Sequence, residues 1–354
     1  MTFQPGPIIL IGSGETGASM RKVYDWLFKE LAGPIRLAIL ETPAGFEPNS
    51  AWVAGQIADF MHKRLKNFRP EIAVIPARQR GTPYSPDNAE LLAPLLTANV
   101  IMMGPGSPTY AARQLHDSLA WHTLIARHRL GVALILASAA TVAVGAHALP
   151  VYEIYKVGEE LHWKAGLKLF QPYNLSPVFI PHWNNSDGGI NLDTSHCYMG
   201  RARFTQLLRL LPPGMTVVGI DEHTALVIDP VAQCGRVMGV GQVTLLRAGR
   251  KDCFPAGDSF SLTELGPFRL PAPQAGLPPK IWESVRAAQV EATQPVQPDV
   301  RPPTAVLALV EKRAAARTRC DWAMADALRD EIEVLGWRVL DSPEGPVVER
   351  IQPA

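Results

Sequence analysis

The first 138 residues alternate between short apolar runs and longer amphipathic segments, and this alternation constrains the fold more than any other feature of the sequence. The apolar runs end in glycine or other turn residues and lie within 7–15, 35–45, 71–78, 99–107 and 131–138. Helical spacing of apolar residues covers about 18–32, 49–68, 86–97 and 109–129. Buried strands that alternate with helices are typical of a parallel sheet covered on both faces. We therefore expect an α/β fold with a parallel, doubly wound sheet.

The loops that follow the strands are the expected place for a site, because ligands of such sheets bind beyond the carboxyl ends of the strands. These loops are 12–17, 41–50, 104–108 and 138–141. Further along, 152–170 resembles a hairpin or an irregular insertion, and "SPVFIPHWNN" predicts a strand that ends at His182. "MTVVGIDEHTALVID" predicts two strands with a turn between them, and "RVMGVGQVTLLRAG" predicts one more strand.

The composition changes near Gly266, and this change predicts the domain organisation. Residues 267–303 contain nine prolines in 37 residues, interrupted by the short helical pattern "KIWESVRAAQVEA". Such a segment is typical of a semi-rigid linker. We therefore expect an α/β domain at 1–266, a linker at 267–303 and a tail at 304–354, in which two helices form a small hairpin and a β-hairpin closes the chain.

Charge and cysteine usage restrict the class of protein. A net charge of +1 provides no field that would recruit nucleic acid or a membrane surface. The four cysteines are scattered, without a CxxC pair or histidines at metal-binding spacing, so we expect reduced thiols and no metal. Because no basic leader or membrane-length apolar run is present, we expect a cytoplasmic, soluble protein. The sequence does not indicate the oligomeric state.

The segment "LASAA" follows a predicted strand and precedes a predicted helix, as a nucleophile elbow does. An elbow presents its serine on a strained turn with small neighbours, usually as G-x-S-x-G, whereas here Leu136 precedes and Ala140 follows Ser138. The pattern alone therefore leaves two interpretations open: Ser138 is a nucleophile, or it is a small residue where the sheet meets a helix.

Acyl transfer by Ser138 would need further groups, and the strand-end loops offer candidates for each. The backbone N–H of Ala139 could stabilise an oxyanion, together with Gly106 or Ser107, because Pro105 in that loop has no N–H. His182 is the candidate base, with His196 and His223 as alternatives. Asp221 and Glu222 in "GIDEHTALV" are candidates for the orienting acid. Cys197 is a weaker candidate nucleophile, because it lacks the context of an elbow.

Four motifs occur together in the order and rough spacing of one family: "MMGPGSPTY", "LASAATVAVG" followed by "PVYEIYKVG", "IPHWNN" and "GIDEHTALV". Over about residues 5–250 the chain resembles the serine peptidases that include aspartyl dipeptidase and cyanophycinase, which share the class I glutamine-amidotransferase-like fold. The resemblance implies Ser138 as nucleophile, His182 as base and Glu222 as acid, with Gly106 and Ala139 at the oxyanion hole. The chain departs from the family's Gly-x-Ser-Ala-Gly elbow and from the Gly-Gly pair of its oxyanion loop.

Two functions from different classes follow. The first is a serine hydrolase that cleaves a short peptide or amide without a metal or organic cofactor, with Arg201, Arg203 and Asn185 as candidate substrate contacts. The second is a catalytically inactive amidotransferase-like module that binds a ligand in its pocket and docks RNA or a protein partner through its tail. Glutamine amidotransfer is disfavoured, because the elbow carries serine and not cysteine.

The tail resembles the C-terminal helical segment of cysteinyl-tRNA synthetase. This resemblance implies a docking role for RNA or a protein, whereas the synthetase's catalytic and zinc-binding segments are absent. Residues 303–354 carry seven Lys/Arg and nine Asp/Glu, a net charge of 7 − 9 = −2, although surfaces that bind RNA are usually basic. The matching residues are Glu311, Arg313, Ala316, Arg317, Asp321, Ala325, Asp326, Arg329, Asp330, Gly336, Asp341 and Gly345.

Overall fold

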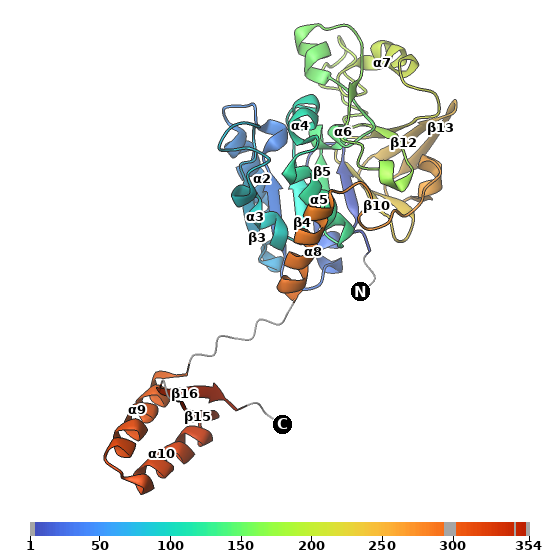
Figure 1. Ribbon diagram of the computed structural model, residues 1–354. Helices are drawn as coiled ribbons and strands as arrows, with labels where there is room; N and C mark the ends of the chain where they lie inside the picture. The colour runs from blue at the N-terminus through green and yellow to red at the C-terminus, as the bar shows by residue number, and fades with distance from the viewer. Residues whose placement is uncertain (1–3, 294–301, 343–344, 352–354) are drawn as a thin grey trace. The chain divides into compact units, whose positions relative to one another are not determined.

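The computed structural model describes residues 4–293, 302–342 and 345–351. Figure 1 shows its helices and strands, which belong to two compact units, Met1–Ala292 and Thr293–Ala354. Within the described ranges, the helices are all too short or too polar to cross a membrane.

The first unit is built on an eight-stranded sheet in the order β14-β11-β10-β1-β5-β4-β2-β3. Its parallel part consists of the five predicted strands, β1 (Ile8–Ile11), β2 (Arg36–Leu40), β3 (Glu71–Ile75), β4 (Val100–Met103) and β5 (Ala133–Ala137). The other three strands pair antiparallel: β10 (Thr224–Asp229), β11 (Cys234–Gly239) and β14 (Ser259–Ser261). The expected parallel sheet is therefore confirmed for these five strands, whereas the edge formed by β10, β11 and β14 is antiparallel. A short turn joins β10 to β11, and such a turn can connect only antiparallel neighbours.

Helices cover both faces of this sheet. α1 (Ala18–Glu30) and α2 (Ser50–Arg64) pack on one face, and α3 (Ala89–Thr97), α4 (Pro108–Leu115) and α5 (Leu119–Arg129) pack on the other. The short 3-10 helices η1 (Thr42–Ala44) and η2 (Lys66–Phe68) flank α2. The single helix expected over 109–129 is divided, because Asp117 has a φ of 54° and the Ser118 hydroxyl starts α5 by accepting the Trp121 N–H at 3.1 Å.

A second sheet adjoins the first, in the order β13-β12-β9-β8. It contains β8 (Pro177–Ile180), β9 (Thr216–Ile220), β12 (Gln242–Arg247) and β13 (Arg250–Pro255). Phe204 and Leu207 of α7 (Gly200–Arg209) pack in the same core cluster as Val178 of β8. The one strand expected in "RVMGVGQVTLLRAG" is two strands, β11 and β12, and these belong to different sheets. The turn after β9 likewise carries the chain from the second sheet into the first.

The remaining elements of the first unit are short, apart from its last helix. They are α6 (Ala139–Ala143), β6 (His147–Ala148), β7 (Lys164–Ala165), the π-helical turn η3 (Glu153–Val157) and the 3-10 helices η4 (Gln171–Tyr173) and η5 (Leu262–Leu265). β6 and β7 form a two-stranded hairpin within the predicted irregular insertion.

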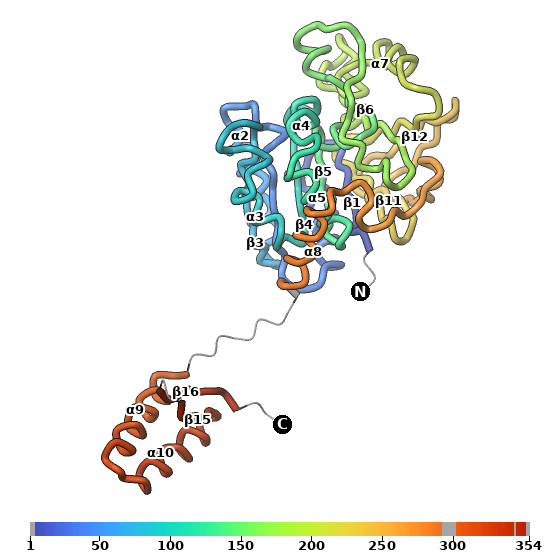
Figure 2. The backbone as a smooth tube through the Cα atoms, viewed as in Figure 1, coloured from blue at the N-terminus to red at the C-terminus, as the bar shows by residue number. Residues whose placement is uncertain are grey.

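The last helix of the first unit, α8 (Pro279–Thr293), changes the predicted linker. Trp282 and Val285 pack against Ala126 of α5, and Figures 1 and 2 show the two helices side by side. The linker predicted from residue 267 therefore begins too early, since this apolar contact holds α8 on the first unit. Residues 294–301 of the predicted linker lie outside the described residues.

The second unit contains the two helices and the hairpin expected in the tail. These are α9 (Thr304–Thr318), α10 (Trp322–Val334), β15 (Trp337–Ser342) and β16 (Gly345–Arg350); the turn residues 343–344 lie outside the described residues. The core consists of Val306, Val310, Ile332, Trp337 and Val339. Leu307, Met324 and Leu335, which share the helical spacing of the apolar residues, are about half exposed.

Candidate active site

Ser138 lies in a sharp turn between β5 and α6. Its φ of 50° and ψ of −108° are strained for a residue other than glycine, as the backbone of a nucleophile elbow is. The Ser138 N–H donates to the carbonyl of Ile11 at 3.0 Å, and the buried Thr141 hydroxyl donates to the carbonyls of Ile11 and Leu136 at 3.0 and 2.8 Å. The ends of β1 and β5 therefore hold the strained turn in place.

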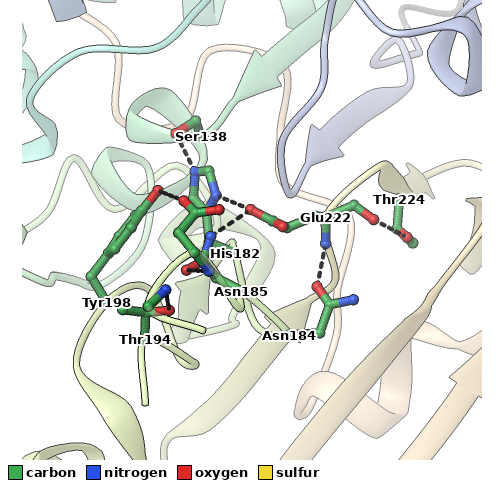
Figure 3. Close-up of polar contacts among 10 residues, drawn as sticks. Ser138, His182, Asn184, Asn185, Thr194, Tyr198, Glu222 and Thr224 are labelled. Atoms are coloured by element: carbon green, nitrogen blue, oxygen red, sulfur yellow. Dashed lines mark hydrogen bonds and ion pairs between the residues drawn. The ribbon is translucent and has the colours of Figure 1, made fainter. Parts of the chain in front are cut away.

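His182 contacts Ser138 from the second sheet. Its Nε2 atom lies 2.9 Å from the Ser138 Oγ atom, as Figure 3 shows. His182 follows β8 with a φ of 50°. Its backbone N–H donates to the Gly12 carbonyl at 3.3 Å, and its carbonyl accepts the Cys197 N–H at 3.1 Å. These backbone contacts orient the imidazole toward the serine.

Glu222 completes the chain of hydrogen bonds in Figure 3. Its Oε1 atom lies 2.8 Å from His182 Nδ1 and accepts the Asn185 side-chain amide at 3.0 Å. The Glu222 N–H donates to the Asn184 side-chain oxygen at 2.8 Å. The hydrogen bond from His182, aided by the one from Asn185, lowers the pKa of Glu222 to about 2. Glu222 is therefore ionised at neutral pH and can hold a proton on Nδ1 of His182.

The three side chains come from two different sheets. Ser138 follows β5 of the first sheet, His182 follows β8 of the second, and Glu222 lies in the turn from β9 to β10 that joins them. Gly12 lies where the sheets meet: its N–H donates to the Thr224 carbonyl at 2.9 Å, and a Cβ there would lie 2.1 Å from the Asp221 carbonyl oxygen. The absence of a side chain at residue 12 therefore permits the two sheets to approach.

The alternative bases and acid lie outside this chain of hydrogen bonds. His196 stacks on Phe204 and bonds to the Ser195 hydroxyl at 2.7 Å, and His223 lies beside Gly14. Asp221 accepts the Gln242 N–H at 3.0 Å, and burial raises the pKa of its carboxyl group. The structure thus places His182 beside Ser138 and Glu222 beside His182, and these neighbours take neither position.

A cavity of about 400 Å³ opens at Ser138 and His182. It is also lined by Pro105, Gly106, Pro108, Ala139, Val142, Val151, Tyr152, Tyr155, Lys156, Pro181, Cys197 and Tyr198. Both expected oxyanion residues, Gly106 and Ala139, therefore border the same cavity as the serine hydroxyl.

Gly106 has a conformation that requires glycine. Its φ is 140°, and a Cβ would lie 2.0 Å from the Pro43 carbonyl oxygen. The N–H of Ser107 donates to that same carbonyl at 2.9 Å. The Ser107 N–H is thus already bonded to the Pro43 carbonyl, so in this loop the Gly106 N–H is the better candidate to donate to an oxyanion.

None of the three expected substrate contacts lines the cavity. Arg203 donates to the carbonyls of Met199 and Tyr198 at 2.8 and 3.0 Å, and Arg201 is exposed on α7. Asn185 is 3% exposed and bonds to Glu222. Their positions do not support the sequence prediction. The cation that does line the cavity is Lys156, which sequence reasoning missed because its segment shows no regular periodicity.

Cys197 lines the cavity as a buried thiol. Burial, with a further effect of the nearby Glu222 charge, raises its pKa to about 12. Because the thiolate is the nucleophilic form, this environment disfavours Cys197 as a nucleophile. Within residues 4–293, 302–342 and 345–351, no group of three or more His, Cys, Asp or Glu side chains is arranged to hold a metal ion.

Comparison with solved structures relates the fold to peptidases, whereas no family model matches the chain. The structure is similar to the crystal structure of a peptidase from an acI-B1 actinobacterium, with a TM-score of 0.59 and 21% identity, over 73% of this chain and 98% of that one. A putative peptidase E protein from Listeria monocytogenes EGD-e matches with a TM-score of 0.42 and 13% identity, over 72% of this chain and all of that one.

Curated relatives match only a short part of the chain. Cysteine–tRNA ligase of Chlamydia felis is 43% identical over 63 residues, which are 18% of this chain and 12% of the ligase. The ligase of Caldicellulosiruptor saccharolyticus is 50% identical over 50 residues, which are 14% of this chain and 11% of the ligase. This chain thus spans about a tenth of the length of these relatives. It shares the fold of a solved peptidase, and its C-terminal segment resembles a short part of cysteine–tRNA ligases.

Proposed function

We propose that the first unit is a serine hydrolase that cleaves a short peptide or amide. One observation carries the proposal: Ser138 Oγ lies 2.9 Å from His182 Nε2, and His182 Nδ1 lies 2.8 Å from Glu222 Oε1, at the wall of a cavity. Nucleophile, base and orienting acid are within hydrogen-bond reach of one another, as acyl transfer requires.

The mechanism follows from this geometry. His182 Nε2 accepts the hydroxyl proton as Ser138 Oγ attacks the substrate carbonyl, and the backbone N–H groups of Gly106 and Ala139 stabilise the oxyanion. The imidazolium then protonates the leaving amine, and an acyl-enzyme remains on Ser138. Water attacks this ester as it gives a proton to His182 Nε2. The imidazolium then returns a proton to Ser138 Oγ as the ester bond breaks, which releases the acid and restores the serine hydroxyl. Glu222 stays ionised throughout and stabilises the imidazolium.

We also assign the first unit to the class I glutamine-amidotransferase-like fold of the aspartyl dipeptidase and cyanophycinase peptidases. Two observations support the assignment: the four sequence motifs fall at the loops that meet around Ser138, and the fold is shared with a solved peptidase. Leu136, which stands where the family elbow has glycine, is 1% exposed and packs in the core. The departure at this position is thus accommodated beneath the turn.

A serine-directed fluorophosphonate probe tests the proposal. We expect the wild-type chain to be labelled and the Ser138→Ala variant to remain unlabelled. Ser186→Ala is the matched control, because Ser186 is exposed and outside the cavity, and it should be labelled like wild type. Labelling of Ser138→Ala to the wild-type extent refutes the nucleophile. An unlabelled wild type favours the non-catalytic binding module.

A second candidate function concerns the tail, and it is favoured by the identity of 43% and 50% with parts of cysteine–tRNA ligases. We propose that the second unit docks RNA, with tRNA as the first ligand to test. In a gel-shift experiment the full chain should retard a cysteine tRNA, and a chain that ends at residue 303 should not retard it. Equal retardation of the tRNA by the two chains refutes docking by the tail.

A further inference from the structure

The side chains that line the cavity include a positive charge and no carboxylate among the described residues. Of the lining residues that the structure describes, Lys156 is the only lysine or arginine, and none is an aspartate or a glutamate. Among the described residues, Lys156 forms no ion pair, and its ammonium group lies 4.9 Å from the centre of the Tyr155 ring. The cavity therefore offers one free cation to a ligand, and its lining side chains offer no anion.

A row of aromatic rings connects the reacting centre to this cation. The rings of His182 and Tyr198 lie 5.7 Å apart, and those of Tyr198 and Tyr155 lie 5.6 Å apart. Lys156 follows above Tyr155 at 4.9 Å. This row bounds the path from His182 to Lys156 at about 16 Å, and an extended peptide, which advances roughly 3.4 Å per residue, spans such a path with about five residues at most.

Lys156 is carried by a braced element. It belongs to the π-helical turn η3, in which Ile154 is buried in the core. Glu153 of the same turn accepts the Thr109 hydroxyl of α4 at 2.5 Å, so its carboxylate contacts α4. π-Helical turns are rare and frequently occur at functional sites, since they redirect side chains that a regular helix would space differently. Here the turn presents both Tyr155 and Lys156 to the cavity.

We propose that Lys156 binds the free C-terminal carboxylate of a short peptide substrate and that the cavity does not select for a free amino end. The inference rests on the hydrolase function proposed above. The C-terminal carboxylate is the one anion that every short unmodified peptide carries, and a cavity of about 400 Å³ admits only a short ligand. A positively charged amino end has no carboxylate side chain to pair with among the lining residues.

Binding to the full chain carrying Ser138→Ala tests this without turnover, by calorimetry with the pentapeptide Ala-Ala-Leu-Ala-Ala as the free acid, as the C-terminal amide and as the N-acetylated acid. We expect the acid to bind roughly fivefold more tightly than the amide, a modest ratio because Lys156 is exposed. N-acetylation should change the affinity by less than about twofold. Adding Lys156→Met should abolish the preference for the acid, whereas Lys164→Met, an exposed lysine outside the cavity, should preserve it.

Several results would overturn the inference. Equal binding of acid and amide, or no measurable binding of the acid, removes the role of Lys156. A peptide amide that contains an aspartate could also bind as tightly as the free acid. That result would show that Lys156 binds a side-chain carboxylate and not the C-terminal one. Fluorophosphonate labelling of wild type separates these failures from failure of the hydrolase function, because labelling depends on Ser138 and not on the carboxylate.

Discussion

Replacing Glu222 by glutamine removes one charge while it keeps an oxygen that can accept hydrogen bonds from His182 and Asn185. The pKa of Glu222 is lowered from 4.5 to about 2, first by the hydrogen bond from His182. Without solvent screening, a pKa shift of this size would contribute about 3 kcal/mol to the free energy of unfolding. Because a quarter of the Glu222 side chain is exposed, solvent screening reduces the stabilisation to about 1–2 kcal/mol.

The pH dependence follows from the direction of this shift. A carboxyl group whose pKa is lowered in the folded state stabilises the fold fully above its unfolded value, near pH 4.5, and loses that stabilisation as the pH falls toward 2. We therefore expect Glu222→Gln to be less stable than wild type by about 1–2 kcal/mol at pH 7 and by a smaller amount at pH 3.

Urea unfolding followed by tryptophan fluorescence measures the difference, since six of the eight tryptophans lie in the first unit. The control is Asp221→Asn: burial raises the pKa of Asp221, so its ionised form destabilises the fold, and asparagine still offers an acceptor to the Gln242 N–H. This variant should not lose stability at pH 7. A Glu222→Gln deficit that is as large at pH 3 as at pH 7 refutes the electrostatic account.

Three further predictions concern the supporting residues. Asn185→Ala removes one donor to Glu222 and should lower kcat/KM about tenfold, measured on whichever amide or ester substrate the wild type turns over; an unchanged value excludes a positioning role. Gly106→Ala should destabilise the chain by more than about 2 kcal/mol in thermal unfolding. The control Gly33→Ala should cost about 1 kcal/mol, because Gly33 also has a positive φ but has open surroundings. Similar losses for the two variants would show that the close approach of Gly106 to Pro43 is unimportant. Arg313→Ala breaks the pair of hydrogen bonds to Asp341 at 2.9 and 3.0 Å. It should speed amide hydrogen exchange across 304–342 by about tenfold. Arg329→Ala is the control and should leave the exchange unchanged, because the Arg329 side chain is exposed.

The parallel half of the first sheet was predictable because its strands are apolar on both faces. β1 to β5 are short apolar runs in the sequence, and amphipathic helical segments separate them, of which the one over 109–129 is divided in the structure. The antiparallel edge was not predictable in the same way. β10, β11 and β12 lie close together along the chain, and apolar runs alone do not reveal that one of the three belongs to a different sheet.

The candidate site shows the same division. Ser138, His182 and Glu222 each follow a strand, and the motifs around them made their positions predictable. The substrate contacts were not predictable, because the direction of a side chain depends on tertiary packing: Arg203 turns to nearby carbonyls, and Asn185 turns to Glu222. The π-helical register that brings Lys156 to the cavity has no recognisable periodicity in the sequence.

The junction at Gly12 has a consequence for the alignment of Ser138 and His182. Ser138 follows a strand of the first sheet and His182 follows a strand of the second. The two side chains therefore stay aligned only while the sheets keep their contact at Gly12. A displacement of one sheet relative to the other would lengthen the distance from Ser138 Oγ to His182 Nε2 even if the strand pairing within each sheet were unchanged.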